Sequence, residues 1–120
     1  MTQERIEAAA KALNASYPLR WAMPPWDELV KSKDRANQNR VKLDREYASS
    51  ALAAADAHDA VNGVHRVSLD DATIERAAEA LFMANNPEAD WHRFSKMSRV
   101  TDAYRKQARA VLAAAVKEEQ

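Results

Sequence analysis

The sequence has no cysteine, only one glycine and no net charge. Without cysteine, the chain can form neither disulfide bonds nor thiolate metal sites. A single glycine excludes the glycine-rich loops that cradle phosphates, because these need more than one. The balanced charge argues against intrinsic disorder, which usually comes with a large net charge. These absences predict a folded domain without cross-links.

Large aliphatic residues are also scarce. Leu, Ile, Val and Phe together number 20 among the 120 residues, whereas alanine alone numbers 26. Alanine is the best helix former, so we expect an all-α protein with a thin, alanine-lined core. Aromatic side chains should then supply much of the buried area. A second copy of the chain could complete so sparse a core, so self-association is one possibility.

Long apolar runs are absent. The longest, Ala110–Val116, is far shorter than the roughly 20 residues of a transmembrane helix. The opening stretch MTQERIEAAAKAL carries interleaved charges in place of the apolar block of a signal peptide. We therefore expect a soluble, cytoplasmic protein without membrane contact.

The chain contains an internal repeat. IEAAAKAL from Ile6 and IERAAEAL from Ile74 match at six of eight positions. We expect two tandem units of helix, short helix and long helix, at about residues 3–61 and 68–118, packed into one bundle. Residues 1–120 would then form a single domain, because neither unit could bury its apolar face alone. The alternative is convergence, since alanine-rich amphipathic helices resemble one another.

The repeat extends to aromatic residues further along each unit. Trp26 corresponds to Trp91, and Tyr47 corresponds to Tyr104. The interval between these residues is about eight residues longer in the first unit, and we assign the excess to the polar stretch 31–40. That stretch is predicted as a loop or an exposed helix, because insertions in exposed connections cost little.

Local signals set the expected helix boundaries. The predicted helices cover residues 3–16, a short segment from Trp26, about 40–61 and 68–83, a short segment that carries Trp91 and Phe94, and about 98–117. Ser68 is the predicted N-cap of the fourth helix, with Asp71 completing a capping box. Asn86–Pro87 is predicted to cap the short helix that follows. Asn62–Gly63 predicts a helix stop, with a β-hairpin turn as the alternative.

Basic residues are concentrated in one tract of each unit. The first tract runs from Lys31 to Arg45 and the second from Arg93 to Arg109. If the units pack about a pseudo-twofold axis, the two tracts could straddle phosphates. The alternative is a solvated surface that the acidic residues of each unit's first helix neutralise.

No set of residues predicts catalysis or metal binding. Asp56, His58 and Asp59 lie close together, but zinc sites usually need three or four ligands at fixed spacing. Ser49 and Ser50 lack the glycine-rich turn of a nucleophile elbow. We therefore expect no cofactor, no metal and no enzymatic activity.

Residues 74–112 combine Ile-Glu-x-Ala-Ala-x-Ala-Leu with Asp90–Trp91 and with Tyr104–Arg105, followed by Ala108–Arg109. This pattern resembles a short helical segment found in many small uncharacterised proteins of phages that infect actinobacteria. The first half of the chain follows it loosely. The resemblance implies a phage or prophage accessory protein and implies no catalytic residues.

These observations favour a non-enzymatic protein-interaction module, whose partner would be a host protein if the chain is phage-encoded. Tryptophan and arginine dominate interface energetics, and the expected contact residues are Trp21, Met23, Arg105 and Arg109. The alternative is nucleic-acid binding through the basic tracts. The residues expected to contact phosphates are Arg93, Lys96, Arg99 and Lys106.

Overall fold

The computed structural model describes residues 3–17, 24–61, 69–94 and 98–118. These ranges contain six helices: α1 (Gln3–Ala15), α2 (Trp26–Lys31), α3 (Arg35–Val61), α4 (Asp71–Asn85), α5 (Trp91–Phe94) and α6 (Ser98–Glu118). No strand occurs in the described ranges, so the all-α prediction is confirmed. None of these helices combines the length and the apolar composition that crossing a membrane requires. The stop or hairpin predicted at Asn62–Gly63 lies outside the described residues.

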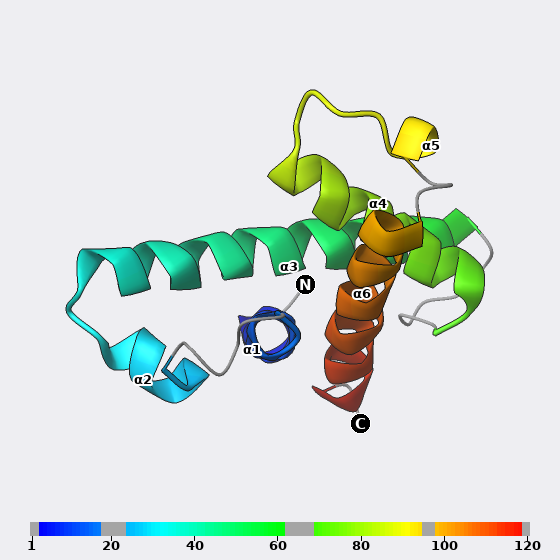
Figure 1. The fold of residues 1–120 in the computed structure, drawn as a ribbon. Helices are drawn as coiled ribbons and strands as arrows, with labels where there is room; N and C mark the ends of the chain where they lie inside the picture. Colours follow the sequence, from blue (N-terminus) through cyan, green and yellow to red (C-terminus); the bar gives the residue numbers. More distant parts are fainter. Residues whose placement is uncertain (1–2, 18–23, 62–68, 95–97, 119–120) are drawn as a thin grey trace.

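The four longer helices form the bundle. α1 packs against α3 and α6, and α4 packs against the same two helices. Figure 1 shows α3 running across the molecule, with α1 below it and seen almost end-on. The first turns of α3 extend past the bundle, and α2 lies beside them. The short helices α2 and α5 therefore lie at opposite ends of the molecule.

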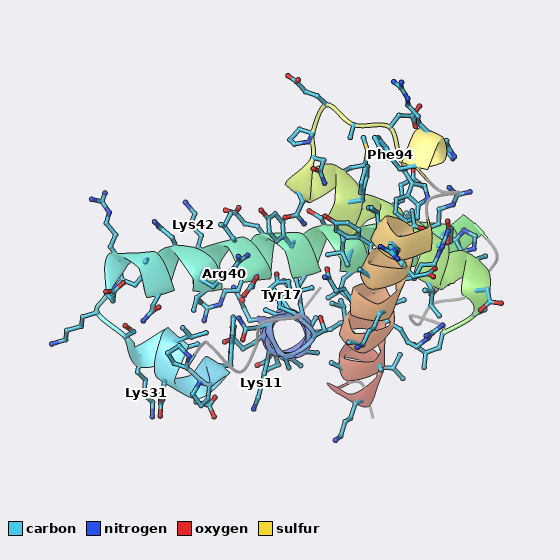
Figure 2. All side chains as sticks on the ribbon, viewed as in Figure 1. Lys11, Tyr17, Lys31, Arg40, Lys42 and Phe94 are labelled. Atoms are coloured by element: carbon cyan, nitrogen blue, oxygen red, sulfur yellow. The ribbon has the colours of Figure 1, made fainter. Side chains whose placement is uncertain are left out.

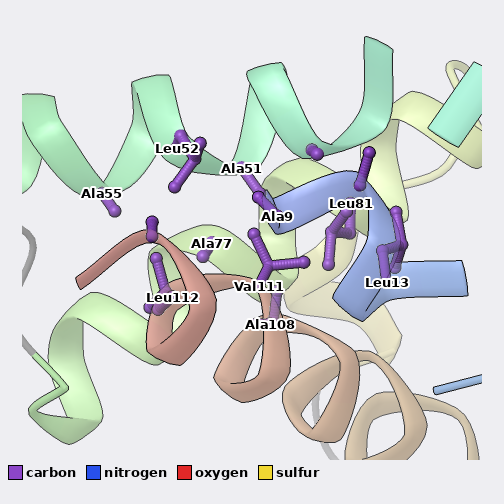
Figure 3. Close-up of a cluster of buried hydrophobic side chains, with 14 of the residues drawn as sticks. Ala9, Leu13, Ala51, Leu52, Ala55, Ala77, Leu81, Ala108, Val111 and Leu112 are labelled. Atoms are coloured by element: carbon purple, nitrogen blue, oxygen red, sulfur yellow. The ribbon is translucent and has the colours of Figure 1, made fainter. Parts of the chain in front are cut away.

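The core is lined by alanine, as expected from the composition. Nine of the buried hydrophobic residues in the described ranges are alanine. Each bundle helix contains a pair made of a buried alanine and, four residues later, a buried leucine, and the side chains of these pairs are at most 1% exposed. The pairs are Ala9–Leu13 in α1, Ala48–Leu52 in α3, Ala77–Leu81 in α4 and Ala108–Leu112 in α6. Figure 3 shows leucine and alanine side chains of the four helices gathered between the ribbons.

Aromatic rings complete the core, again as predicted. Trp26, Phe82 and Trp91 are buried. The rings packed against the core but partly exposed are Tyr17, Tyr47, Phe94 and Tyr104. The remaining tryptophan, Trp21, lies outside the described residues.

Two helices begin where acidic side chains cap them. α3 begins at Arg35 because Asp34 Oδ1 accepts hydrogen bonds from the backbone N–H groups of Ala36 at 2.8 Å and Asn37 at 3.3 Å. The polar stretch 31–40 is thus largely exposed helix. α4 is capped by Asp70, whose Oδ1 accepts from the N–H of Thr73 at 2.8 Å. The predicted cap, Ser68, lies outside the described residues. The helix begins at Asp71, directly after Asp70.

The predicted role of Asn86–Pro87 is wrong. Asn86 ends α4, because its N–H donates to the carbonyl oxygen of Phe82 at 2.8 Å. The next helix, α5, is capped instead by Asp90, whose Oδ1 accepts from the N–H of His92 at 3.0 Å. Asn86–Pro87 and Asp90–Trp91 both have the composition of a helix N-terminus. The sequence pattern alone does not distinguish them.

The buried face of α6 begins at a polar residue. Thr101 is fully buried, whereas the neighbouring Val100 is 37% exposed. Threonine is tolerated there because its hydroxyl oxygen accepts a hydrogen bond from Arg105 Nη1 at 3.0 Å.

The alanine-lined core should reject larger side chains. Ala51→Leu in α3 places a bulky residue at a fully buried position, so we expect a loss of about 1–3 kcal/mol from overpacking. Ala53→Leu, exposed on the same helix, is the matched control and should change stability by less than about 0.5 kcal/mol. Urea unfolding monitored by circular dichroism measures both. Equal stability of the two variants would contradict the packing described here.

Candidate functional site

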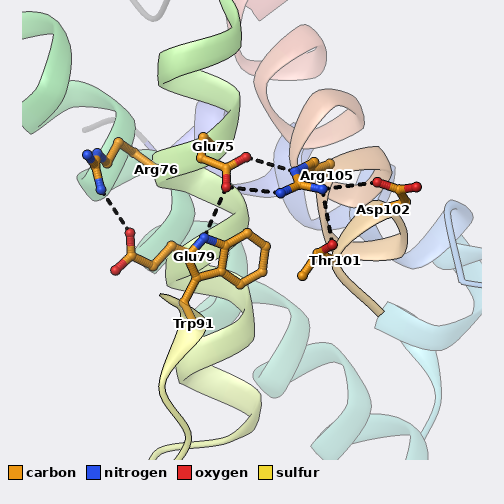
Figure 4. A network of polar contacts seen from close by, with 7 residues as sticks. All are labelled: Glu75, Arg76, Glu79, Trp91, Thr101, Asp102 and Arg105. Atoms are coloured by element: carbon orange, nitrogen blue, oxygen red, sulfur yellow. Dashed lines mark hydrogen bonds and ion pairs between the residues drawn. The ribbon is translucent and has the colours of Figure 1, made fainter. Parts of the chain in front are cut away.

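The carboxylate of Glu75 joins three helices of the second half. It accepts a hydrogen bond from the indole Nε1 of Trp91 in α5 at 3.0 Å. It also accepts from Arg105 in α6, through Nε at 2.8 Å and Nη2 at 3.1 Å. Arg105 further donates to Thr101 and to Asp102, each at 3.0 Å. Figure 4 shows this network between α4, α5 and α6.

Glu7 makes the same set of contacts in the first half. It accepts from the indole Nε1 of Trp26 in α2 at 3.0 Å. It also accepts from Arg45 in α3, through Nε at 2.8 Å and Nη2 at 3.0 Å. In each half the guanidinium lies over the tryptophan ring, 6.0 Å from the ring centroid for Arg45 and 5.5 Å for Arg105. We call these two groups of residues the Glu7 cluster and the Glu75 cluster.

The arginines keep both carboxylates ionised. The hydrogen bond from Arg45 lowers the pKa of Glu7 below its ordinary value of 4.5, although burial opposes this effect. The hydrogen bond from Arg105 lowers the pKa of Glu75 in the same way. A general acid or base working at neutral pH needs a pKa near 7, so these carboxylates are suited to holding helices together and not to proton transfer.

The two clusters match the long helices α3 and α6 in another register than the sequence comparison. Their arginines match Arg45 with Arg105, whereas the sequence comparison aligned Tyr47 with Tyr104. The two alignments differ by three residues, close to one helical turn, so both place alanines on the same face of the helix. An alanine-rich stripe therefore could not distinguish them.

A polar pair in the first half stands where the second half has aromatic rings. Asp44 is fully buried and accepts from Asn14 Nδ2 and Arg40 Nη2, both at 2.9 Å, and from Tyr17 Oη at 2.5 Å. Burial, followed by the hydrogen bond to Asp44, raises the pKa of Tyr17 above its ordinary value, so its hydroxyl stays protonated and donates. Sequence analysis missed Asn14 and Asp44. The position of Asp44 was the available signal for its burial. Asp44 lies on the buried face of α3, four residues after Arg40, with which it forms an ion pair.

The corresponding positions of the second half hold Phe82 and Tyr104. Phe82 follows Leu81 as Asn14 follows Leu13, and Tyr104 precedes Arg105 as Asp44 precedes Arg45. The rings of Phe82 and Tyr104 meet edge to face, with centroids 5.4 Å apart and an interplanar angle of 85°. Trp91 and Phe94 also pack on Phe82, with their ring centroids 5.5 and 5.7 Å from the centroid of its ring.

The predicted contact residues are in different situations. Arg105 is held within the Glu75 cluster, with its side chain 29% exposed. Arg109, the other predicted protein contact in α6, is exposed, as are three of the predicted phosphate contacts, Arg93, Arg99 and Lys106. Trp21, Met23 and Lys96 lie outside the described residues. Their roles in partner binding stay predictions.

The acidic residues near His58 are occupied by structural contacts. The Asp56 carboxylate accepts hydrogen bonds from both terminal nitrogens of Arg5, at 2.9 and 2.7 Å. Asp59 accepts from the hydroxyl of Thr73 at 3.0 Å. Across the ranges that the structure describes, no group of three histidine or acidic side chains is arranged to hold a metal ion.

An open groove of about 800 Å³ lies between α1, α2 and the end of α6. Its apolar surface comes from Ala8, Val30 and Ala114, with Trp26 beneath. The charged residues that line it are Glu4, Glu7, Lys11, Asp27, Lys31 and Lys117. Figure 2 shows Lys11 and Lys31 extending to the same side of the molecule. Sequence analysis missed this groove, because residues far apart in the chain form it.

A second, smaller hollow of about 640 Å³ lies along the turn between α4 and α5. Residues 86–90, Arg93 and Phe94 line it. A single stretch of chain forms it, whereas three helices form the groove between α1, α2 and α6.

No protein-family model, curated protein or solved structure matches the chain. Function is therefore inferred from the geometry and charge of these sites.

Removing the charge of Glu75 should weaken the fold. Glu75→Gln keeps the shape of the side chain but loses the ionic contact with Arg105, so we expect a loss of about 1 kcal/mol at neutral pH. This figure lies below the range for hydrogen bonds to charged groups, because Glu75 is 36% exposed and water screens it. Glu46→Gln, at an exposed position of α3, is the control and should be nearly neutral.

The effect should depend on pH in one direction. The folded-state pKa of Glu75 lies below 4.5, so its stabilisation is complete above that pH and is lost as the pH falls through the folded-state value. The wild-type and Glu75→Gln proteins should therefore converge in stability in acid. Urea unfolding at neutral pH and at about pH 3 measures this difference, and a constant gap would contradict the ionic role of Glu75.

Proposed function

We propose that this chain is a small, non-enzymatic protein-interaction module of the cytoplasm. In keeping with the resemblance of residues 74–112, we further propose that it is a phage accessory protein whose partner is a protein of the bacterial host. The observation that carries the proposal is the open groove between α1, α2 and α6. It is the larger hollow of the two described, and three separate helices build it.

The carboxylates with the closest polar contacts are engaged within the fold. Glu7 and Glu75 bind arginine and tryptophan within the fold, and Asp44 is buried among three donors. The groove, by contrast, offers apolar surface to solvent, with Val30 42% exposed. Exposed apolar surface with a charged rim is typical of protein-binding sites. This division supports recognition of a partner over chemistry on a substrate.

We also propose that the two halves are copies of one ancestral unit. The Glu7 and Glu75 clusters have the same composition, and each joins a long helix, a short helix and a second long helix. The Ala-Leu pairs recur at corresponding positions of α1 and α4, and of α3 and α6. The packing of α1 against α3 and α6 is matched by the packing of α4 against α6 and α3, as a pseudo-twofold axis would require.

The nucleic-acid alternative has one observation in its favour. Several basic side chains of both tracts are exposed, among them Lys33, Arg35, Lys42, Arg99 and Lys106. However, Figure 1 places α2 and the start of α3 at the opposite end of the molecule from α5 and the start of α6. Moreover, Arg45 and Arg105 contribute to internal ion pairs and not to a continuous basic surface.

Affinity capture from an actinobacterial lysate tests the interaction proposal. The wild-type chain should retain a specific protein, and Val30→Glu should reduce its recovery at least about tenfold by placing an unpaired charge in the groove. Val100→Glu is the matched control, because Val100 is similarly exposed, at 37%, but lies in the first turn of α6. Circular dichroism should show that both variants fold.

Equal capture by Val30→Glu and the wild type, or capture of no specific protein, would overturn the proposal. Retention of nucleic acid instead would favour the alternative, provided that it weakens steeply between about 50 and 200 mM salt.

The proposed duplication predicts that the Asn14–Asp44 pair can be exchanged for its aromatic counterpart. Asn14→Phe and Asp44→Tyr should each cost about 2–3 kcal/mol, because the first removes one of three donors to the buried Asp44 carboxylate and the second leaves the buried Asn14 amide without its acceptor. The double variant should recover at least about 1 kcal/mol relative to the sum, because the two rings can then meet as Phe82 and Tyr104 do. Urea unfolding of the four proteins measures this coupling, and additive losses would count against structural equivalence of the two pairs.

A further inference from the structure

We infer that the groove between α1, α2 and α6 binds an acidic, amphipathic helix of a partner protein, with the helix's apolar face against Ala8, Val30 and Ala114. This inference rests on the proposed function and names the chemistry of the partner segment. It is carried by the shape of the groove, the lysines around it and its difference from the related place in the second half.

The shape of the groove suits a helix. Two of its apolar positions are alanines, Ala8 in α1 and Ala114 in α6, and alanine permits close approach of another helix axis. The groove is open to solvent along its length and is not a closed chamber. Small-molecule sites usually bury most of the ligand's surface, whereas a helix laid into a groove buries one face only.

The free charge around the groove favours an acidic segment. Lys11, Lys31 and Lys117 come from three different helices. Within the described ranges none of the three forms an ion pair, whereas Glu7 is already bound to Arg45. Two further carboxylates line the groove, Glu4 and Asp27, so the three lysines exceed them by one positive charge. Both lie in the first turn of their own helix, where negative charge is favoured by the helix dipole.

The corresponding surface of the second half is closed to such a partner. Arg76 follows Glu75 where Ala8 follows Glu7, and Glu79 stands where the first half has Lys11. Arg76 donates to Glu79 at 3.1 Å, and His92 Nε2 lies 3.9 Å from the same carboxylate. Charged side chains that bind one another thus occupy the place of the apolar floor. If the halves began as copies, the groove is a feature that only the first half kept or acquired.

Two other occupants fit less well. A second copy of the chain, related by a twofold axis at the groove, would add three more lysines and only two more free carboxylates, Glu4 and Asp27, to the interface. Lysines would then stay in excess, and like charges cost energy at an interface. Single-stranded nucleic acid binds by stacking its bases on exposed rings, but Trp26 is only 4% exposed and its N–H is bound to Glu7.

Selection from a displayed library of random peptides of about 16 residues, roughly four helical turns, tests the inference with the full chain as bait. The selected peptides should carry more Asp and Glu than Lys and Arg, with apolar residues at i, i+3, i+4 and i+7. The tightest synthetic peptide, measured by fluorescence anisotropy, should lose at least about tenfold in affinity for a Lys11→Gln, Lys31→Gln, Lys117→Gln triple variant.

A second triple variant, Lys33→Gln, Lys42→Gln, Lys106→Gln, is the matched control. It removes the same charge at exposed positions away from the groove, and it should bind the peptide like the wild type. All six lysines are exposed, so both variants should keep the wild-type melting temperature.

The outcomes separate this inference from the proposed function. Selected peptides that are basic or uncharged, or whose binding both triple variants reduce equally, would overturn the acidic helix. Lysate capture that depends on Val30 would then still support the interaction module. A concentration-dependent dimer in sedimentation that Val30→Glu abolishes would assign the groove to a second copy and would also overturn the inference.

Discussion

The architecture depends on two carboxylates that each bind an indole N–H and a guanidinium. Helices α2 and α5 have only six and four residues, and helices this short are not stable alone in water. Each is fixed by one tryptophan, which is buried against the core while its N–H reaches Glu7 or Glu75. The same carboxylate binds an arginine of the following long helix. One acidic residue in each half therefore sets the relative positions of three helices that alanine-rich surfaces alone would leave poorly specified.

Around this shared framework, the two halves use different chemistry. The first buries an aspartate among amide, phenol and guanidinium donors, and the second packs three aromatic rings around Phe82. A buried polar network can fix a unique arrangement, but it adds little net stability. Aromatic packing gives more apolar burial. Under the proposed duplication, the halves diverged in their interiors and also on their surfaces, where the first has an open groove and the second an ion pair.

The helices and most of the core could be predicted from the sequence, because alanine and leucine recur at helical spacing. Leu13, Leu81 and Leu112, each four residues after an alanine, are all buried. The burial of Asn14 and Asp44 could not be predicted, since burial of a polar side chain is tolerated only with a partner, here 30 residues away in the chain. The groove was missed for a related reason: the end of α6 must lie beside α1 before Ala114 and Lys117 can face Lys11. Periodicity reports which face is buried, and not which distant element covers it.

The pairing of α1 with α6 has a consequence for synthesis on the ribosome. α1 emerges first, yet one of the two long helices that cover it is the last to be made. Until α6 leaves the exit tunnel, the nascent chain exposes the side of α1 that α6 later buries. Domains generally fold as units during translation, so this bundle can close only after α6 has left the exit tunnel. Ribosome stalling within α6 should therefore leave a species that chaperones recognise.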